Sequence, residues 1–180
     1  MYNKEELEKQ ELFQIIEHDG YDRQIGHLIS MMNYARITTI DAVIGLSLSE
    51  LDFLLDEKAN SIGMLLFHIA SVDFIYRTTS IHKREPTKEE LAFWSPALNL
   101  GKIGQEKIKG YDSAFYFELL AIERKKTLEE LAKLDDKWIY EEVDFWGGSK
   151  ANNCFRWFHV LEDEINHRGQ IRMIKKRIVG

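Results

Sequence analysis

Hydrophobic residues recur every three or four positions along four long stretches of the chain, and this spacing predicts amphipathic helices. Asn60 and Ser61 stand where the second stretch begins, and either side chain can cap a helix. The four predicted helices cover residues 21–45, 60–79, 112–134 and 152–178. Long helices with medium-length connections and few strand signals are typical of an all-α protein, so the pattern predicts a four-helix bundle.

The same spacing predicts which face of each helix is buried. On the first helix the buried stripe leaves out Arg36 and Asp41. On the third helix the stripe is imperfect; it consists of Phe115, Leu119, Ile122, Lys126 and Leu128. On the second helix the stripe places an imidazole among aliphatic side chains; it consists of Leu65, His68, Val72 and Ile75. His68 is therefore predicted to point inward.

Two stretches are less regular than the helices. Residues 80–111 contain both prolines of the chain and form a long irregular connection between the second and third helices. Within it, Thr87–Glu90 matches a capping box, which predicts one short helix through Trp94. Connections of this length are usually functional or mobile, so Phe93 and Trp94 either cover a site or pack in the core. Residues 139–145 precede a Gly-Gly turn signal and predict a short hairpin arm.

Polar residues interrupt the buried stripe of the last helix. This stripe consists of Trp157, Val160, Asp163, His167, Ile171, Ile174 and Ile178. Asp163 and His167 are four residues apart, so their Cβ atoms are neighbours at ~5–6 Å. A carboxylate and an imidazole in this arrangement suit a metal site in which both side chains converge on one ion.

A buried carboxylate without a partner is costly, so Asp163 needs a counter-charge. The residues leave open a protonated His167, an arginine or a metal ion; the arginines are Arg36, Arg156 and Arg168. A metal ion satisfies both Asp163 and His167, and His68 is then the natural third ligand because it also occupies an apolar stripe. His159 lies at the edge of the stripe, ~12 Å along the helix axis from His167, and is expected to support the ligands or the fold.

Composition and charge limit the classes of function that the chain is expected to have. The chain has 180 residues, of which 44% are hydrophobic, and this size predicts one domain over residues 1–180. The net charge of −6 argues against broad binding of nucleic acids. No apolar run approaches the ~20 residues that a membrane helix needs. Cys154 is the single cysteine and cannot form an internal disulfide, which fits a reducing cytoplasm.

Two segments resemble the signatures of a known family. NSIGMLLFHIASVDFIY, residues 60–76, and WFHVLEDEINHRGQI, residues 157–171, are similar to the two motifs of the DinB-like superfamily, which includes bacillithiol and mycothiol S-transferases. The order of helices is similar over nearly the full chain. The resemblance implies a four-helix bundle that holds a divalent metal through three histidines. His68 and His167 match two of them, and Asp163 stands in the place of the other.

The substitution leaves a set of two histidines and one carboxylate, which suits zinc or nickel and also iron. Arg168 and Gln170 belong to the second motif and are expected to anchor it by hydrogen bonds. The resemblance implies a metal-dependent enzyme that transfers a small thiol to a small electrophile, with metal-dependent hydrolysis as the close variant. The alternative is a non-catalytic bundle in which Asp163 and His167 form a buried polar pair and the surface mediates binding, a homodimer included.

Overall fold

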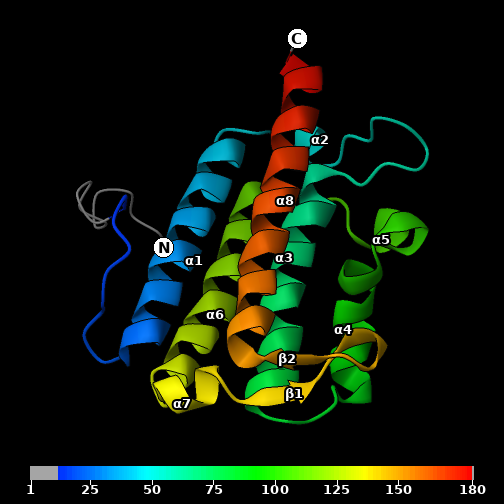
Figure 1. The fold of residues 1–180 in the computed structure, drawn as a ribbon. Helices are drawn as coiled ribbons and strands as arrows, with labels where there is room; N and C mark the ends of the chain where they lie inside the picture. Colours follow the sequence, from blue (N-terminus) through cyan, green and yellow to red (C-terminus); the bar gives the residue numbers. More distant parts are fainter. Residues whose placement is uncertain (1–11, 180) are drawn as a thin grey trace.

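Four long helices run lengthwise beside one another and form a bundle in the computed structural model, which describes residues 12–179 (Figure 1). They are α1 (Arg23–Val43), α3 (Ile62–Tyr76), α6 (Ser113–Leu131) and α8 (Asn153–Val179). Helix α8 packs against α1 and α3, and α3 also packs against α6. The predicted all-α bundle is confirmed. Within the described residues, no helix combines the length and the apolar character that crossing a membrane requires.

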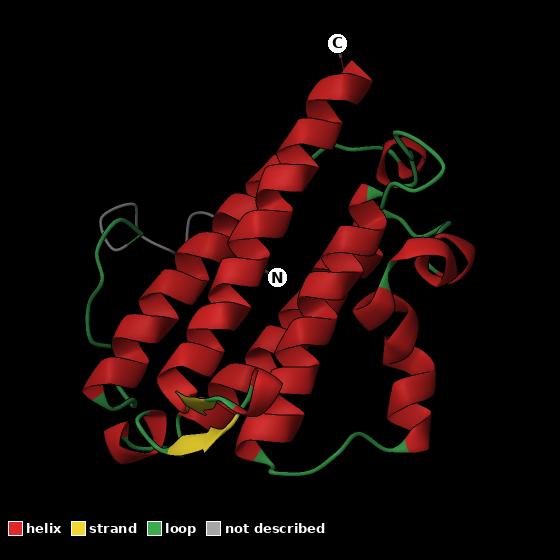
Figure 2. Ribbon diagram, turned by 45° about the vertical axis from the view of Figure 1, so that its right-hand side comes forward, coloured by secondary structure: helices red, strands yellow, loops and turns green. Residues whose placement is uncertain are grey.

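Shorter elements occupy the connections. Between the bundle helices lie α2 (Leu48–Leu51), the π-helix η1 (Arg77–Ile81), α4 (Lys88–Asn99), α5 (Gly101–Lys107) and α7 (Asp136–Ile139). A hairpin of β1 (Glu142–Asp144) and β2 (Lys150–Asn152) precedes α8, with the 3₁₀ turn η2 (Trp146–Gly148) at its tip. The strands are antiparallel, with Val143 opposite Ala151. Figure 2 shows the hairpin at one end of the bundle and the helices of the long connection along one side.

Helix α4 is longer than the sequence predicts. Its start is confirmed, because the Thr87 hydroxyl accepts from the Glu90 amide and the Glu90 carboxylate accepts from the Thr87 amide. Its end was predicted at Trp94, but the helix continues past Pro96 to Asn99. Trp94 stacks on Phe74 with ring centroids 5.1 Å apart, and its side chain is buried. Trp94 is thus a core residue rather than a cover over a site.

Each of the four long helices contributes one charged side chain to a buried ion-pair network; the members are Arg36, Asp73, Arg124 and Glu164. Arg36 donates from Nε to Glu164 at 2.8 Å and from Nη2 to Asp73 at 3.0 Å. Arg124 donates from Nε to Asp73 at 3.1 Å and from Nη2 to Glu164 at 2.9 Å. Burial raises the pKa of Asp73, but the two guanidinium groups lower it by more, so this carboxylate stays ionised.

The network explains where the predicted buried faces were wrong. Arg36 was placed off the buried stripe of α1, yet it is fully buried. The predicted stripe of α6 was also wrong, because Ile122 is 43% exposed and the Lys126 side chain 53% exposed. The buried side of α6 instead carries Tyr116, Leu120, Glu123, Arg124, Thr127 and Leu131. Hydrophobic spacing cannot reveal a face on which several of the inward positions are charged.

Candidate metal centre

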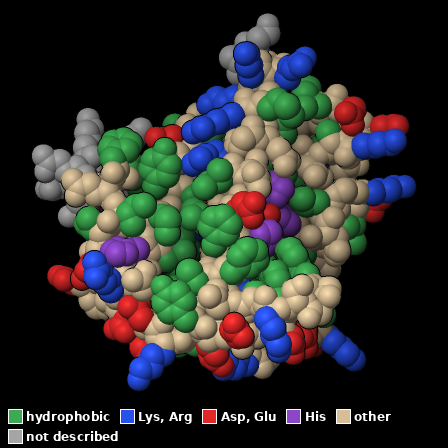
Figure 3. Space-filling model, in the orientation of Figure 1, with side chains coloured by type: hydrophobic (Ala, Val, Ile, Leu, Met, Phe, Trp, Pro, Cys, Tyr) green, Lys and Arg blue, Asp and Glu red, His purple; other side chains and the backbone are tan. Residues whose placement is uncertain are grey.

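Two facing helices supply the three predicted ligands. His68 lies in the middle of α3, and Asp163 and His167 lie one turn apart on α8. The buried stripe predicted around them on α8 is found, with Trp157 and Ile171 fully buried at either side of the pair. Figure 3 shows histidine and acidic side chains gathered near the middle of one face, beside hydrophobic side chains.

The three side chains converge on one point. Nε2 of His68 lies 3.5 Å from Oδ2 of Asp163, and Nε2 of His167 lies 3.3 Å from Oδ1 of the same carboxylate. One ligand atom from each residue lies within 4.8 Å of the other two. The side chains are 13% (His68), 17% (Asp163) and 13% (His167) exposed, so each of them keeps some contact with solvent.

A backbone carbonyl orients His68. Its Nδ1 lies 2.8 Å from the carbonyl oxygen of Ala97, in the last turn of α4. Because a carbonyl only accepts, Nδ1 carries the hydrogen, and in the neutral ring the Nε2 lone pair faces Asp163. A lone pair opposite a carboxylate oxygen repels it unless a cation, either a proton or a metal ion, lies between them. Ligand histidines in metal sites are typically held in this way by their other nitrogen.

The other polar atoms of His68, Asp163 and His167 also fit a site for a cation. Oδ2 of Asp163 and Nδ1 of His167 are buried and accept or donate no hydrogen bond among the residues described. Burial raises the pKa of Asp163, but His167 and His68 lower it by more, so the pKa lies well below its usual range. Burial lowers the pKa of His68, but Asp163 and the Ala97 carbonyl raise it by more. The donor set is thus an ionised carboxylate between two imidazoles, which fits a divalent transition metal.

The supporting residues named from the sequence lie outside this cluster. His159 pairs through Nδ1 with Glu162 at 3.2 Å, and its ring packs edge-on against Trp146 at 4.9 Å. Arg168 donates to the Thr38 hydroxyl on α1 and so ties α8 to its neighbour. Gln170 is exposed.

The arginines considered as partners of Asp163 have other contacts. Arg36 belongs to the buried network, Arg156 donates to Thr79, and Arg168 to Thr38. The role of the Ala97 carbonyl could not be predicted from the sequence, because a backbone acceptor has no residue-type signature. Glu164 was also missed, although the sequence offered a sign of its role. It directly follows Asp163, and two successive acids on a partly buried helix indicate that at least one of them has a positively charged partner.

The structure is thus a helical bundle in which two facing helices bring together two imidazoles and a carboxylate that could hold a metal ion. The chain belongs to the mycothiol-S-transferase family, whose sequence model matches residues 27–180. The resemblance to DinB-like proteins is therefore confirmed.

Among the solved structures with a similar fold is that of a conserved protein from Enterococcus faecalis, with a TM-score of 0.64 over 85% of this chain and 95% of that chain. At 12% sequence identity, this likeness concerns the fold alone. No curated protein matches the chain significantly. The family therefore indicates a function of the thiol S-transferase type, and the substrates have to be argued from the site.

Proposed function

We propose that the protein is a metal-dependent enzyme that transfers a low-molecular-weight thiol to a small electrophile, with His68, Asp163 and His167 as the metal ligands. The observation that carries the proposal is the convergence of three ligand atoms within 4.8 Å on a partly exposed surface. Three protein ligands leave open positions, which is typical of catalytic rather than structural sites. When bound, a divalent ion lowers the pKa of a thiol or water at those positions and so supplies a nucleophile near neutral pH.

The protein orients the proposed ligands and supplies one negative charge to the site. The Ala97 carbonyl fixes the ring of His68, and Asp163 directs one oxygen toward each imidazole. The carboxylate also offsets one charge of a divalent ion. One positive charge then remains at the site to attract an anionic thiolate. Zinc and nickel suit this donor set, and iron also fits it.

Cys154 is not needed as the nucleophile. It lies in the first turn of α8, and burial raises the pKa of its thiol, which lowers the thiolate fraction at neutral pH. The nucleophile in the proposed reaction therefore belongs to the cosubstrate.

The test is conjugation of small thiols, bacillithiol and glutathione among them, to a model haloarene by the zinc-loaded or nickel-loaded protein. His68→Ala is expected to lower the rate at least ~100-fold at every metal concentration, because the ion loses a ligand. Cys154→Ser is expected to leave the rate unchanged. A metal-loaded protein that conjugates no thiol but hydrolyses an ester or amide would support hydrolysis instead. If it does neither, and Asp163→Ala alters only stability, the non-catalytic bundle replaces the enzyme.

The melting temperature is expected to depend on pH in opposite directions with and without metal. In metal-free protein the raised pKa of His68 stabilises the fold below its unfolded pKa of ~6.5, and this contribution is lost as the pH rises through the folded pKa. Metal ligands must be deprotonated, so zinc stabilises more at pH 7.5 than at pH 5. At a hundredfold excess over the dissociation constant, zinc adds ~2.7 kcal/mol to the free energy of unfolding.

Thermal unfolding with zinc or with a chelator, at both pH values, checks this expectation. His82→Ala, which removes an exposed histidine, serves as the control and should behave like the wild type. Melting curves that ignore zinc and chelator at pH 7.5 would count against the site.

A further inference from the structure

Arg156 is a half-buried cation that has no acidic partner among residues 12–179. Its Nη2 donates to the Thr79 hydroxyl at 3.0 Å, and its guanidinium lies over the Tyr76 ring, 5.9 Å from the centroid. Its Nε is buried and has no hydrogen-bond partner in the part of the chain that the structure describes. Across the described part of the chain, no carboxylate lies within ion-pair distance of Arg156, and burial lowers the pKa of its guanidinium. A cation held partly out of water in this way is stabilised by any anion that reaches it.

Arg156 lies on the same face of α8 as the ligand cluster. It precedes Asp163 by seven residues, which is almost two full turns, so the two side chains leave the helix in nearly the same direction. The rise over seven residues is ~10 Å. This separation matches a small molecule that has a sulfur atom at one end and an acidic group several bonds away.

The hydroxyl of Tyr76 interacts electrostatically with both Arg156 and Asp163. Burial raises the pKa of its hydroxyl to about 12, Arg156 lowers it and Asp163 raises it. The phenol therefore stays protonated at neutral pH and is a hydrogen-bond donor. Its ring also contacts His159, with centroids 5.9 Å apart.

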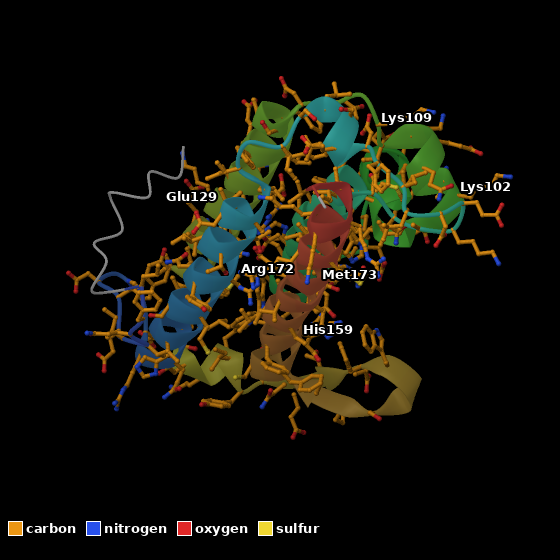
Figure 4. The ribbon with its side chains drawn as sticks, turned by 90° about the horizontal axis from the view of Figure 1, so that it is seen from above. Lys102, Lys109, Glu129, His159, Arg172 and Met173 are labelled. Atoms are coloured by element: carbon orange, nitrogen blue, oxygen red, sulfur yellow. The ribbon has the colours of Figure 1, made fainter. Side chains whose placement is uncertain are left out.

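The surroundings of Arg156 hold it in place. The π-helix η1 brings Thr79 and Ser80 to the start of α8, where Ser80 accepts from Nε1 of the buried Trp157 at 3.1 Å. π-Helical turns occur frequently at functional sites. On the other side, the ring of Trp146 in the hairpin packs against His159, and Figure 4 shows His159 on the part of α8 nearest the hairpin.

We infer that Arg156, assisted by the Tyr76 hydroxyl, binds an acidic group of the thiol cosubstrate while the sulfur reaches the cluster of His68, Asp163 and His167. The inference rests on the proposed function and adds a substrate class: thiols that carry a carboxylate or a phosphate ~10 Å from the sulfur. A guanidinium recognises either group through paired hydrogen bonds. Neutral thiols of the same length are expected to bind more weakly.

The experiment compares two matched pairs of thiols. Glutathione and its dimethyl ester differ only in their carboxylates, and 4′-phosphopantetheine and pantetheine share the thiol arm and differ only in one phosphate. Affinities are measured by calorimetry in zinc-loaded protein, and in metal-free protein as well, so that the preference for the acid is scored whether or not zinc binds. The wild type should bind at least one acidic thiol about tenfold more tightly than its neutral counterpart.

Arg156→Gln should abolish this preference, and Arg156→Lys should restore part of it, because lysine keeps the charge but not the planar fork. Arg172→Gln, on an exposed position of the same helix, is the control (Figure 4). Zinc content, measured in every sample, separates the two hypotheses: a wild type without zinc refutes the metal site, not the acid preference. Equal affinity for acid and neutral thiols, an unchanged preference in Arg156→Gln, or no measurable binding of any of the four thiols overturns the inference.

Discussion

His167→Ala is expected to remove most of the bound divalent ion, which should be close to one per chain in the wild type. The substitution deletes one of three candidate ligands and leaves the half-buried Asp163 facing only His68 across 3.5 Å. Loss of residues that merely orient a ligand weakens metal binding by about 10–100-fold, so loss of a ligand should weaken it by more. Elemental analysis of purified protein, after dialysis against a defined zinc concentration, measures the effect.

Two histidines provide matched controls for this measurement. His82 is exposed and His159 pairs with Glu162, so alanine at either position should leave the zinc content unchanged. The assignment of the ligands is wrong if the alanine variants of His82, His159 and His167 all hold the same amount of zinc.

Arg124→Met is expected to destabilise the fold by about 3–5 kcal/mol, the range found when one member of a buried ion pair is removed. Arg124 makes charged hydrogen bonds to both Asp73 and Glu164, and its Nη1 donates to the Met32 carbonyl at 3.1 Å. The variant leaves two buried carboxylates with only Arg36 as counter-charge. Urea denaturation at neutral pH gives the free energy of unfolding.

Lys125→Met changes the adjacent residue, whose side chain is 77% exposed, and should cost less than ~1 kcal/mol. A loss in Arg124→Met no larger than this control would mean that the network contributes little to stability. Neutralising the partners together, by Glu164→Gln in the Arg124→Met background, should recover part of the loss, because it removes one uncompensated charge.

The sequence predicts all four bundle helices, and it predicts the buried faces of α1, α3 and α8 well because these helices bury largely apolar stripes. The buried face of α6 was predicted wrongly, because Glu123 and Arg124 turn inward to meet partners that lie on other helices. Helix α5 was not predicted; it buries only Gly104 and leaves no apolar stripe in the sequence. Local spacing identifies the buried face of a helix only where the buried positions are apolar.

Some parts of the candidate site could likewise be predicted from the sequence, and others could not. The spacing of Asp163 and His167 lies within one helix, and His68 stands out among aliphatic residues, so the three could be named from the sequence. The Ala97 carbonyl and the contact between Arg156 and Tyr76 depend on how separate segments pack, and no local pattern encodes them.

The bond between His68 and the Ala97 carbonyl joins a candidate ligand to α4, a helix that is not one of the four in the bundle. Under the proposed function, ion binding and the docking of α4 are therefore thermodynamically linked. An ion that needs the Nδ1–H form of His68 favours the docked position of α4, and docking strengthens binding of the ion by the same factor. The position of the long connection and the occupancy of the metal site then influence each other, although the connection supplies none of the three proposed ligands.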